Sequence, residues 1–247
     1  MSYLVNNLQS VVSIITVVYN GEDTLRKTMD SVCNQTVLPY EYIIIDGKST
    51  DSTLAIVNEY MAQYPFIKLW SDHDKGIYDA MNKGIGLASG QLIGLINSDD
   101  WYELDAIEIM TKAYLVNGTG VYYGIQRMFK GAHEYMLERA HHRFIGLKMI
   151  PHPTTFISAD LYSIIGVFAS SYNYSADLEL VLRYLQARVN FFPIDHIIAN
   201  FKLGGASSTP KAALESLKVR RLYGLVSNRA YIFHLLKLRL KKLMSRR

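Results

Sequence analysis

The sequence predicts an α/β protein built around a mostly parallel β-sheet with helices on both faces. Strand and helix patterns alternate along the first half of the 247 residues, and such alternation is typical of parallel strands joined by helical crossovers. The first strand pattern, residues 11–19, is apolar and β-branched almost throughout, as expected of a strand covered on both sides. Polar or acidic residues follow three of the strands directly, where sheets of this kind bind ligands.

Composition excludes several classes of protein. Apolar residues make up 49% and charged residues 19% of the chain, so it is not disordered. The single cysteine, Cys33, excludes a disulfide framework and a cysteine-rich zinc site. No apolar run approaches the roughly 18 residues of a membrane-spanning helix. The first basic residue is Arg26, so the start lacks the charge of a signal peptide, and we expect a cytoplasmic protein.

Four strands and four helices are expected in residues 1–118. The strands are expected at 11–19, 41–46, 67–70 and 91–97. The second helix can be capped by Thr50 or Asp51, the third spans about 76–88, and the fourth begins near Trp101. Apolar residues at helical spacing form the buried faces of the first, second and fourth helices: Leu25, Met29, Val32 and Cys33; Leu54, Val57, Met61 and Tyr64; Ile107, Met110 and Tyr114.

The remaining chain is less regular. Strands are expected at 121–126 and 154–157, with two further short strands near 191–201. A helix is expected from Asp177 to Ala187, followed by a flexible loop at 203–209 and a helical tail from Lys211 to the end. The length suits one large domain, or one domain with an appendage.

Carboxylates gather at the expected carboxyl ends of the strands. Asp46 ends the second strand, and Asp99 and Asp100 follow the fourth. Two adjacent carboxylates repel each other, and a hard divalent cation such as Mg²⁺ or Mn²⁺, which shares its ligand shell with phosphate, relieves that repulsion. The alternative is that the pair only caps the next helix.

Five stretches of the chain resemble the inverting family-2 glycosyltransferases of the GT-A fold. They are 13–36, 42–53, 72–100, 149–162 and 174–185, and the most specific is DHDKGIYDAMNKGIGLASGQLIGLINSDD at 72–100. The subgroup that makes bacterial surface polysaccharides, such as colanic acid, O-antigen and capsule, is the most similar through KGIYDAMNKG, NSDD and LGGASS. The resemblance implies a GT-A domain at 1–210, with a nucleotide-sugar-binding half at 1–118 and an acceptor-side half at 119–210.

The resemblance also implies which residues bind the donor. Thr16, Tyr19 and Glu22 fall where the family lines its nucleotide pocket, and Asp46 falls where a carboxylate accepts the uracil N–H. Asp99 and Asp100 fall on the DXD-type motif that contacts ribose and the metal on the diphosphate. Two positions depart from the family pattern, since Gly47 stands where many members carry a second acid and Asn97 stands at the first DXD position.

Residues 75–84, KGIYDAMNKG, join the acid-rich turn DHDKG to a helix. Backbone N–H groups at a helix start bind phosphate or ribose, so we expect Asp74, Gly76 and Asn82 to contact the donor. The alternative is a surface helix with Ile77, Ala80 and Met81 in the core.

Asp177 falls on the catalytic base of the family. A single in-line displacement needs a carboxylate within hydrogen-bond reach of the acceptor hydroxyl. The alternative role for Asp177 is to cap its helix, and Glu179 is then the second candidate base. His152 lies where related enzymes place an acceptor- or phosphate-side residue. The alternative is that this histidine only supports the structure.

The tail, residues 211–247, is strongly basic. It holds eleven Lys/Arg and one acid, Glu215, for a net charge of +10, whereas the other 210 residues carry −6. A helical stripe of apolar residues lies among these charges, the pattern of an interfacial amphipathic helix. It consists of Leu222, Leu225, Ile232, Leu236, Leu240 and Leu243. The alternative is a helix packed on the body. An acidic body disfavours nucleic acid as a partner, and a lipid-linked acceptor would explain a peripheral contact at the inner face of the cell membrane.

Together these observations predict a metal-dependent inverting glycosyltransferase that moves a sugar from a nucleotide, UDP, to a glycan or lipid-linked acceptor. The first alternative is a nucleotidyltransferase that makes nucleotide-sugars, which should carry a basic, Gly-rich loop after the first strand, where this chain has YNGEDT. The second is a non-catalytic module that docks to membrane or nucleic acid through its tail, and it leaves the carboxylates at the sheet edge without a purpose.

Overall fold

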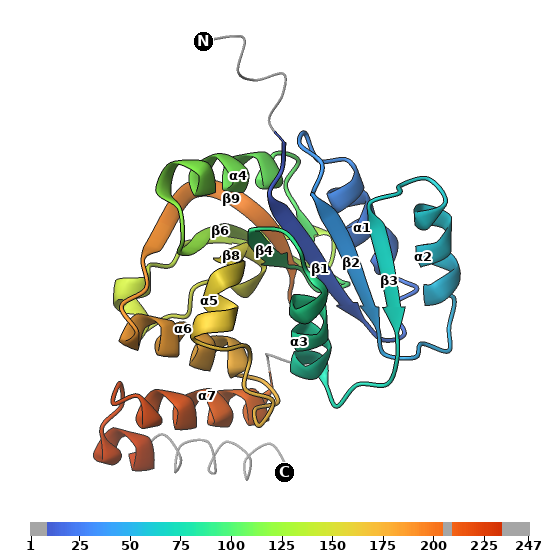
Figure 1. Ribbon diagram of the computed structural model, residues 1–247. Helices are drawn as coiled ribbons and strands as arrows, with labels where there is room; N and C mark the ends of the chain where they lie inside the picture. Colours follow the sequence, from blue (N-terminus) through green and yellow to red (C-terminus); the bar gives the residue numbers. More distant parts are fainter. Residues whose placement is uncertain (1–8, 205–208, 234–247) are drawn as a thin grey trace.

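The computed structural model describes residues 9–204 and 209–233 (Figure 1). Its strands form one mixed sheet. They are β1 (Val12–Val18), β2 (Glu41–Asp46), β3 (Ile67–Ser71), β4 (Leu92–Leu95), β5 (Trp101–Tyr102), β6 (Val121–Lys130), β7 (His133–Glu138), β8 (Thr155–Ser158) and β9 (Phe191–Lys202). The strand order is β3-β2-β1-β4-β8-β6-β9-β5, and β7 pairs with β6.

The α-helices and short 3₁₀ helices between residues 9 and 222 connect these strands or follow them. They are α1 (Leu25–Cys33), α2 (Thr53–Met61), α3 (Ile77–Leu87), α4 (Ala106–Asn117), η2 (His142–Phe144), η3 (His152–Thr154), α5 (Ala159–Ile164), α6 (Ala176–Gln186) and α7 (Pro210–Leu222).

The first half of the sheet is parallel, as predicted. β1 pairs with β2 on one side and with β4 on the other, and β3 extends the sheet beyond β2. Every residue of β1 and β2 is buried, because helices cover both faces of the sheet. The arrowheads of β1, β2 and β3 in Figure 1 point to the same edge, so the residues that follow these strands are brought together there.

Two apolar layers separate the helices from the sheet. On one face α3, α5 and α6 pack against Ile15, Val17 and Ile45. On the other face α1, α2 and α4 pack against Ile14, Val18 and Ile44. Alternate residues of one strand therefore belong to different layers, as the two-residue period of a strand requires. These layers confirm the predicted fold class.

The second half of the sheet adds antiparallel pairs. β8 pairs antiparallel with both β4 and β6, and β9 runs parallel to β6. The two short strands predicted near 191–201 are one long strand, β9. β7 was missed because five of its six residues are exposed and carry no clear apolar alternation.

Two predictions about helices in the first half were wrong. The fourth helix starts at Ala106, because Trp101 and Tyr102 form strand β5 against β9. The buried face of α2 consists of Thr53, Ile56, Val57 and Tyr60, and Met61 is exposed. This face turns toward α1, where the Tyr60 hydroxyl donates to Asp30 Oδ1, a long-range contact that helical spacing does not reveal.

The tail is not one continuous helix. α7 ends at Leu222, and Gly224 adopts φ 72°. The N–H of Leu225 donates to Arg220 O, and that of Gly224 to Arg221 O. This pair of bonds is a Schellman motif, which stops a helix and satisfies its last carbonyls. A second helical segment spans 228–233, and the predicted Leu236, Leu240 and Leu243 lie outside the described residues.

The close packing of α3 on the sheet gives a matched test in one helix. A Cβ at Gly84 would lie 2.5 Å from Ile15 Cγ2 and 3.3 Å from Ile45 Cγ1, whereas a Cβ at Gly86 would meet nothing within 4 Å. We expect Gly84→Ala to lower the free energy of unfolding by about 1–2 kcal/mol through overpacking. Gly86→Ala should raise it by about 0.5–1 kcal/mol through helix propensity. Urea denaturation of both variants measures the difference, and equal effects would contradict the packing described.

Candidate active site

A cleft of about 1330 Å³ opens at the carboxyl edge of the parallel strands. One side of it consists of the turns after β1, β2 and β4, including Tyr19, Gly47 and Asp99. The opposite side consists of η3, the start of α6 and part of α7, and it includes His152 and Asp177. Residues from both predicted halves of the domain therefore meet in one cleft.

The turns after β1 and β2 brace each other. Asn20 N donates to Ser49 Oγ (2.8 Å), and Thr50 N donates to Asn20 Oδ1 (2.8 Å). Glu22 takes part in the same bracing, since its carboxylate accepts from Ser52 N while its own N–H donates to Asp51. Glu22 therefore holds the turns and does not itself line the cleft, whereas Tyr19 lines it and is 63% exposed.

Asp46 is fully buried below the turn that follows β2. Its carboxylate accepts from Lys48 N, Ser49 N and the Ser71 hydroxyl, the last at 2.6 Å. These bonds satisfy the backbone of a tight turn in which Lys48 has φ 65°. The structure thus gives Asp46 a bracing role and brings the next residue, Gly47, to the cleft wall.

The Gly47 departure from the family pattern has a physical reason. Asp74 Oδ2 lies 2.7 Å from the position that a Cβ on Gly47 would take. A side chain at this position would push Asp74 away, and a second acid would place two carboxylates in the same space. Asp74 lines the cleft, and its other oxygen accepts from Gly76 N at the start of α3. Gly76 also lines the cleft, in the φ 120° conformation that glycine adopts readily.

The two neighbouring carboxylates after β4 have different environments. Asp99 lines the cleft, whereas Asp100 is 1% exposed and accepts a hydrogen bond from Lys202 N. Burial, together with the charge of Asp99, raises the pKa of Asp100 to about 8. Among the described residues, Asp100 Oδ2 and Asn97 Oδ1 are buried without a hydrogen-bond partner.

The side-chain oxygens of this turn fit a divalent cation that takes most of its ligands from a substrate phosphate and water. Within residues 9–204 and 209–233 there is no cluster of three or more His, Cys, Asp or Glu side chains that could hold a metal. Mg²⁺ does not require one, because it keeps several waters and binds through one or two carboxylates and the phosphates of its substrate. Asp99 supplies an accessible carboxylate, and two unpaired oxygens lie close to it in the sequence.

Asp177 projects into the cleft from the first turn of α6. The Tyr78 hydroxyl, on α3, donates to Asp177 Oδ1 at 3.3 Å. His152 shares with Asp177 the wall of the cleft and of a small cavity of about 10 Å³ behind it. Burial lowers the pKa of His152, against an opposing effect of the Asp177 carboxylate, so the imidazole is neutral at pH 7.

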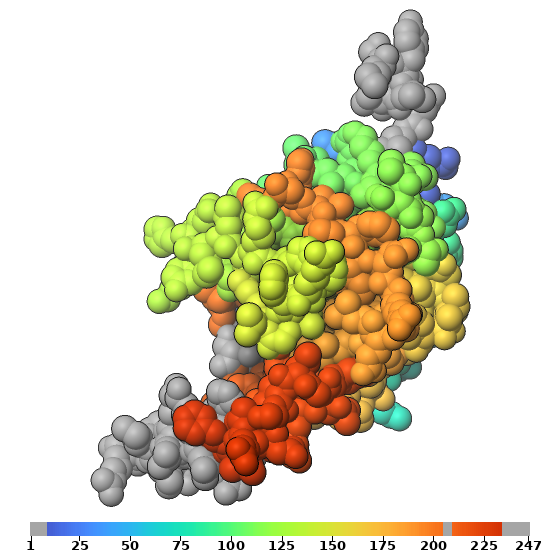
Figure 2. All heavy atoms as spheres, turned by 90° about the vertical axis from the view of Figure 1, so that its left-hand side faces the viewer, coloured from blue at the N-terminus to red at the C-terminus, as the bar shows by residue number. Residues whose placement is uncertain are grey.

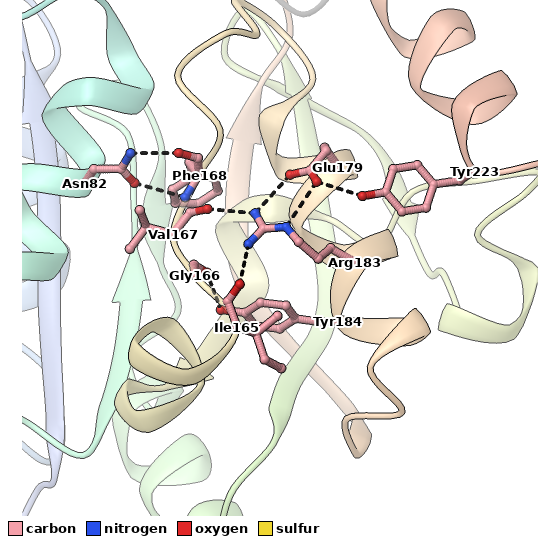
Figure 3. A network of polar contacts seen from close by, with 9 residues as sticks. All are labelled: Asn82, Ile165, Gly166, Val167, Phe168, Glu179, Arg183, Tyr184 and Tyr223. Atoms are coloured by element: carbon pink, nitrogen blue, oxygen red, sulfur yellow. Dashed lines mark hydrogen bonds and ion pairs between the residues drawn. The ribbon is translucent and has the colours of Figure 1, made fainter.

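Glu179 points away from the cleft. Its carboxylate accepts from the guanidinium of Arg183 and from the Tyr223 hydroxyl, and it is 7% exposed (Figure 3). A carboxylate held in this way is not available to an acceptor hydroxyl. Of the two candidate bases, only Asp177 reaches the cleft.

Four predicted donor-binding residues do not line the cleft: Glu22 and Asp46, described above, and Asn82 and Thr16. The Asn82 side chain exchanges two hydrogen bonds with the backbone of Phe168, at 2.8 and 3.0 Å, and so holds the turn at 165–168 against α3 (Figure 3). Thr16 is fully buried, and its hydroxyl shares a hydrogen bond with Tyr42 Oη. The next two residues of β1, Val17 and Val18, do line the cleft, so Thr16 lies just below it in the strand.

Sequence reasoning missed a carboxylate that holds the chain just before Asp177. Glu215 of α7 accepts from three consecutive backbone N–H groups, those of Asn173, Tyr174 and Ser175, at 2.6–3.1 Å. Ser175 precedes α6 and makes no cap with its own side chain. Glu215 therefore satisfies the chain just before the helix that carries Asp177. The available signal was that Glu215 is the single acid in a segment of net charge +10.

α7 is also part of the cleft wall. Ala212, Ala213 and Ser216 line the cleft, and Val219 is buried in the same apolar layer as α6. The helix packing that sequence analysis kept as an alternative for the tail is thus observed for its first helix.

Comparison with known proteins identifies the family. The model of "Glycosyl transferase family 2" matches residues 13–173. The chain belongs to glycosyl transferase family 2. The family-2 resemblance is confirmed, and the two alternative functions are left without support. The matched range covers the donor side of the cleft and ends just before Asp177.

Several curated relatives are similar over part or most of the chain. The chain is 35% identical over 113 residues to hyaluronan synthase of Pasteurella multocida, covering 46% of this chain and 12% of that protein. It is 31% identical over 184 residues to an uncharacterized glycosyltransferase of Mycobacterium tuberculosis, covering 70% of this chain and 68% of that protein. The chain thus spans only a small part of the synthase but about two thirds of the mycobacterial relative.

Solved structures confirm the GT-A fold class. The S. aureus TarS 1–349 structure in complex with UDP-GlcNAc aligns with a TM-score of 0.69 at 19% identity, covering 88% of this chain and 67% of that one. The mannosyltransferase PcManGT from Pyrobaculum calidifontis, in complex with GDP-Man and Mn²⁺, aligns with a TM-score of 0.68 at 14% identity, covering 87% of this chain and 64% of that one.

The role of Glu215 can be tested by substitution. Glu215→Ala leaves three backbone N–H groups without their acceptor, so we expect the free energy of unfolding to fall by about 1–2 kcal/mol, as for the loss of a helix cap. Glu215→Gln keeps one acceptor oxygen and should lose less. Glu134→Ala removes a more exposed acid paired with Arg127 and should change stability little. If Glu215→Ala and Glu134→Ala unfold at the same urea concentration, Glu215 is not a cap.

Proposed function

We propose that this chain transfers a sugar from a nucleotide donor, a UDP-sugar, to a hydroxyl of a glycan or lipid-linked glycan, with inversion at the anomeric carbon. The observation that carries the proposal is that Asp99 and Asp177 line one cleft from opposite sides. The volume of about 1330 Å³ exceeds that of a usual single-ligand pocket, so it offers room for donor and acceptor together.

In this proposal the donor binds at the carboxyl edge of the parallel strands. Tyr19, Asp74, Gly76 and Asp99 are the predicted donor residues that line the cleft. The likeness to TarS with UDP-GlcNAc supports a UDP-sugar, and the likeness to PcManGT with GDP-Man makes GDP the competing nucleotide. Thr16, Glu22, Asp46 and Asn82 then act by holding the strand, turns and helix that form this edge.

A divalent cation, Mg²⁺ or Mn²⁺, would be held by Asp99 with Asp100 beside it. When bound, such an ion neutralises the negative charge of a leaving diphosphate. The protein's own contribution at this point is the fixed position of Asp99, because Asp100 and the Oδ1 atom of Asn97 are buried in the turn that carries it.

The remaining chemistry belongs to Asp177. The oxygen of the acceptor hydroxyl attacks the anomeric carbon while the bond from that carbon to the diphosphate oxygen breaks. The nucleoside diphosphate leaves with the bonding electrons, and Asp177 takes the hydroxyl proton. Tyr78 orients the Asp177 carboxylate, and Glu215 fixes the chain before its helix.

The proposed acceptor is attached to a lipid, and the proposed location is the inner face of the cell membrane. No helix in the described part of the chain is long and apolar enough to cross a membrane. The contact would be peripheral and would use the basic tail, 211–247, as its own segment after the domain at 1–210. In the described part of this tail Leu222 is 72% and Ile232 is 57% exposed, which supports an interfacial role.

The role of Asp177 is tested by a nearly isosteric substitution. Asp177→Asn should keep nucleotide binding and lose transfer by roughly 10²–10⁴-fold, the usual contribution of a positioned base. The structure puts Asp177 inside α6 and makes Ser175 the N-cap residue, so the capping alternative is wrong. If Asp177 is not the base, Asn serves almost as well and turnover stays near normal. NMR of the product should show a β-glycoside from an α-linked UDP-sugar, and retention of configuration would exclude the single displacement.

The metal site is tested through nucleotide binding. We expect Asp99→Asn to weaken UDP binding in Mn²⁺ at least tenfold, because it removes the carboxylate that faces the cleft. In EDTA the variant and the unaltered protein should bind UDP equally well. Calorimetric titration with UDP and with GDP measures both effects and the choice of base. Full transfer activity in EDTA would exclude the metal-dependent mechanism.

A further inference from the structure

Exposed apolar side chains from two distant segments lie on one surface of the molecule. We call it the loop–tail surface and define it by five residues. They are Phe144 (62% exposed), Leu147 (86%), Leu222 (72%), Leu225 (39%) and Ile232 (57%). Figure 2 shows the segment around residues 141–150 directly beside α7 and the residues that follow it.

The two segments are joined by specific contacts. The guanidinium of Arg220, near the end of α7, donates to the carbonyls of Ile145 and Gly146, the latter at 2.7 Å. A Cβ on Gly146 would lie 3.8 Å from Leu225 Cδ2. Because Ile145 is itself buried, these contacts hold the loop against the end of α7 and beside Leu225.

The segments that carry these apolar tips also carry exposed basic side chains. They are exposed on η2, on α7 and on the segment after it: Arg143, Lys211, Lys218, Arg221 and Arg229. The one acid of the tail, Glu215, is bound on the inner side of α7 to the chain at 173–175. The outer side therefore combines apolar tips with positive charge and carries no carboxylate from α7.

This combination favours an anionic lipid bilayer as the occupant. Apolar side chains flanked by Lys and Arg are typical of interfacial membrane binding, and each basic residue near an anionic surface adds to the attraction. A second copy of the chain docked through the same surface would set these basic groups against each other, and like charges at an interface are repulsive.

The loop leads directly into the cleft. Residues 148–153 follow Leu147 and line its acceptor-side wall, ending beside His152. A bilayer in contact with Leu147 would therefore lie next to the entrance that an acceptor uses. The same contact would also orient the cleft relative to the membrane.

We propose that Phe144 and Leu147 insert into the headgroup region of an anionic bilayer beside the end of α7, and that this insertion presents the acceptor-side wall of the cleft to lipid-linked molecules. The membrane contact of the proposed function is thereby extended from the tail to a loop of the catalytic domain. This insertion proposal rests on the proposed function only for the identity of the acceptor.

The test uses the full chain and vesicles that contain phosphatidylglycerol and phosphatidylcholine. We expect Phe144→Ser with Leu147→Ser to weaken sedimentation with these vesicles at least tenfold, since two apolar anchors are lost. The matched control is Leu115→Ser with Val116→Ser, which removes two side chains of similar exposure on α4 (57% and 82%) and should bind like the unaltered protein. Equal binding by all three proteins overturns the proposal.

A second measurement does not depend on loss of binding. The tryptophan fluorescence of the Leu147→Trp variant should shift to shorter wavelength when anionic vesicles are added. That of the Val116→Trp variant should not shift. No shift at position 147 overturns the proposal. A dimer in solution that becomes a monomer in the Phe144/Leu147 variant also overturns it, because the surface would then bind a second copy.

The same proteins separate this proposal from the proposed function. UDP binding and transfer to a water-soluble acceptor should be unchanged in the Phe144/Leu147 variant, because neither residue lines the cleft. If no sugar transfer is found in any variant but vesicle binding still depends on the loop, the docking surface stands and the glycosyltransferase proposal fails.

Discussion

The parallel pairing of β1 with β2 and β4 is the constraint on which the rest of the molecule depends. Because these strands are buried on both faces, they need helices on both sides, and each crossover returns the chain to the same edge. The polar turns therefore collect at the opposite, carboxyl edge. Their backbone groups are satisfied locally by Asp46, Asn20 and Glu22, and this leaves Asp74 and Asp99 free to face the cleft.

The two sides of the cleft are built in different ways. The donor side consists of turns held by hydrogen bonds between neighbouring loops, within one regular parallel sheet. The acceptor side depends on long-range contacts among α3, α6, α7 and the turn at 165–168, which Asn82, Arg183 and Tyr223 connect. This network explains why Asp177 reaches the cleft and Glu179, two residues further on, does not.

The regular half of the fold could be predicted from sequence because each buried strand is an apolar run and each helix has apolar spacing. The failures occurred where distant contacts decide the structure. Trp101 forms a strand only because β9 lies beside it, and β7 is defined by pairing with β6 rather than by its own side chains. In the site, family motifs placed the correct segments at the cleft. They did not give side-chain contacts, which bind Thr16 to Tyr42 and Asn82 to Phe168 instead of directing them into the cleft.

The capping of the chain before α6 by Glu215 has a consequence for the order in which the molecule is made. Domains form from the N-terminus as the chain is synthesised. The bonds that brace the turns after β1 and β2 join residues that precede position 54, so this part of the cleft edge can form early on the ribosome. The chain at 173–175 keeps three bare N–H groups until residue 215 has emerged. A nascent chain can therefore brace these turns well before the start of α6 is held, and that step must wait for α7.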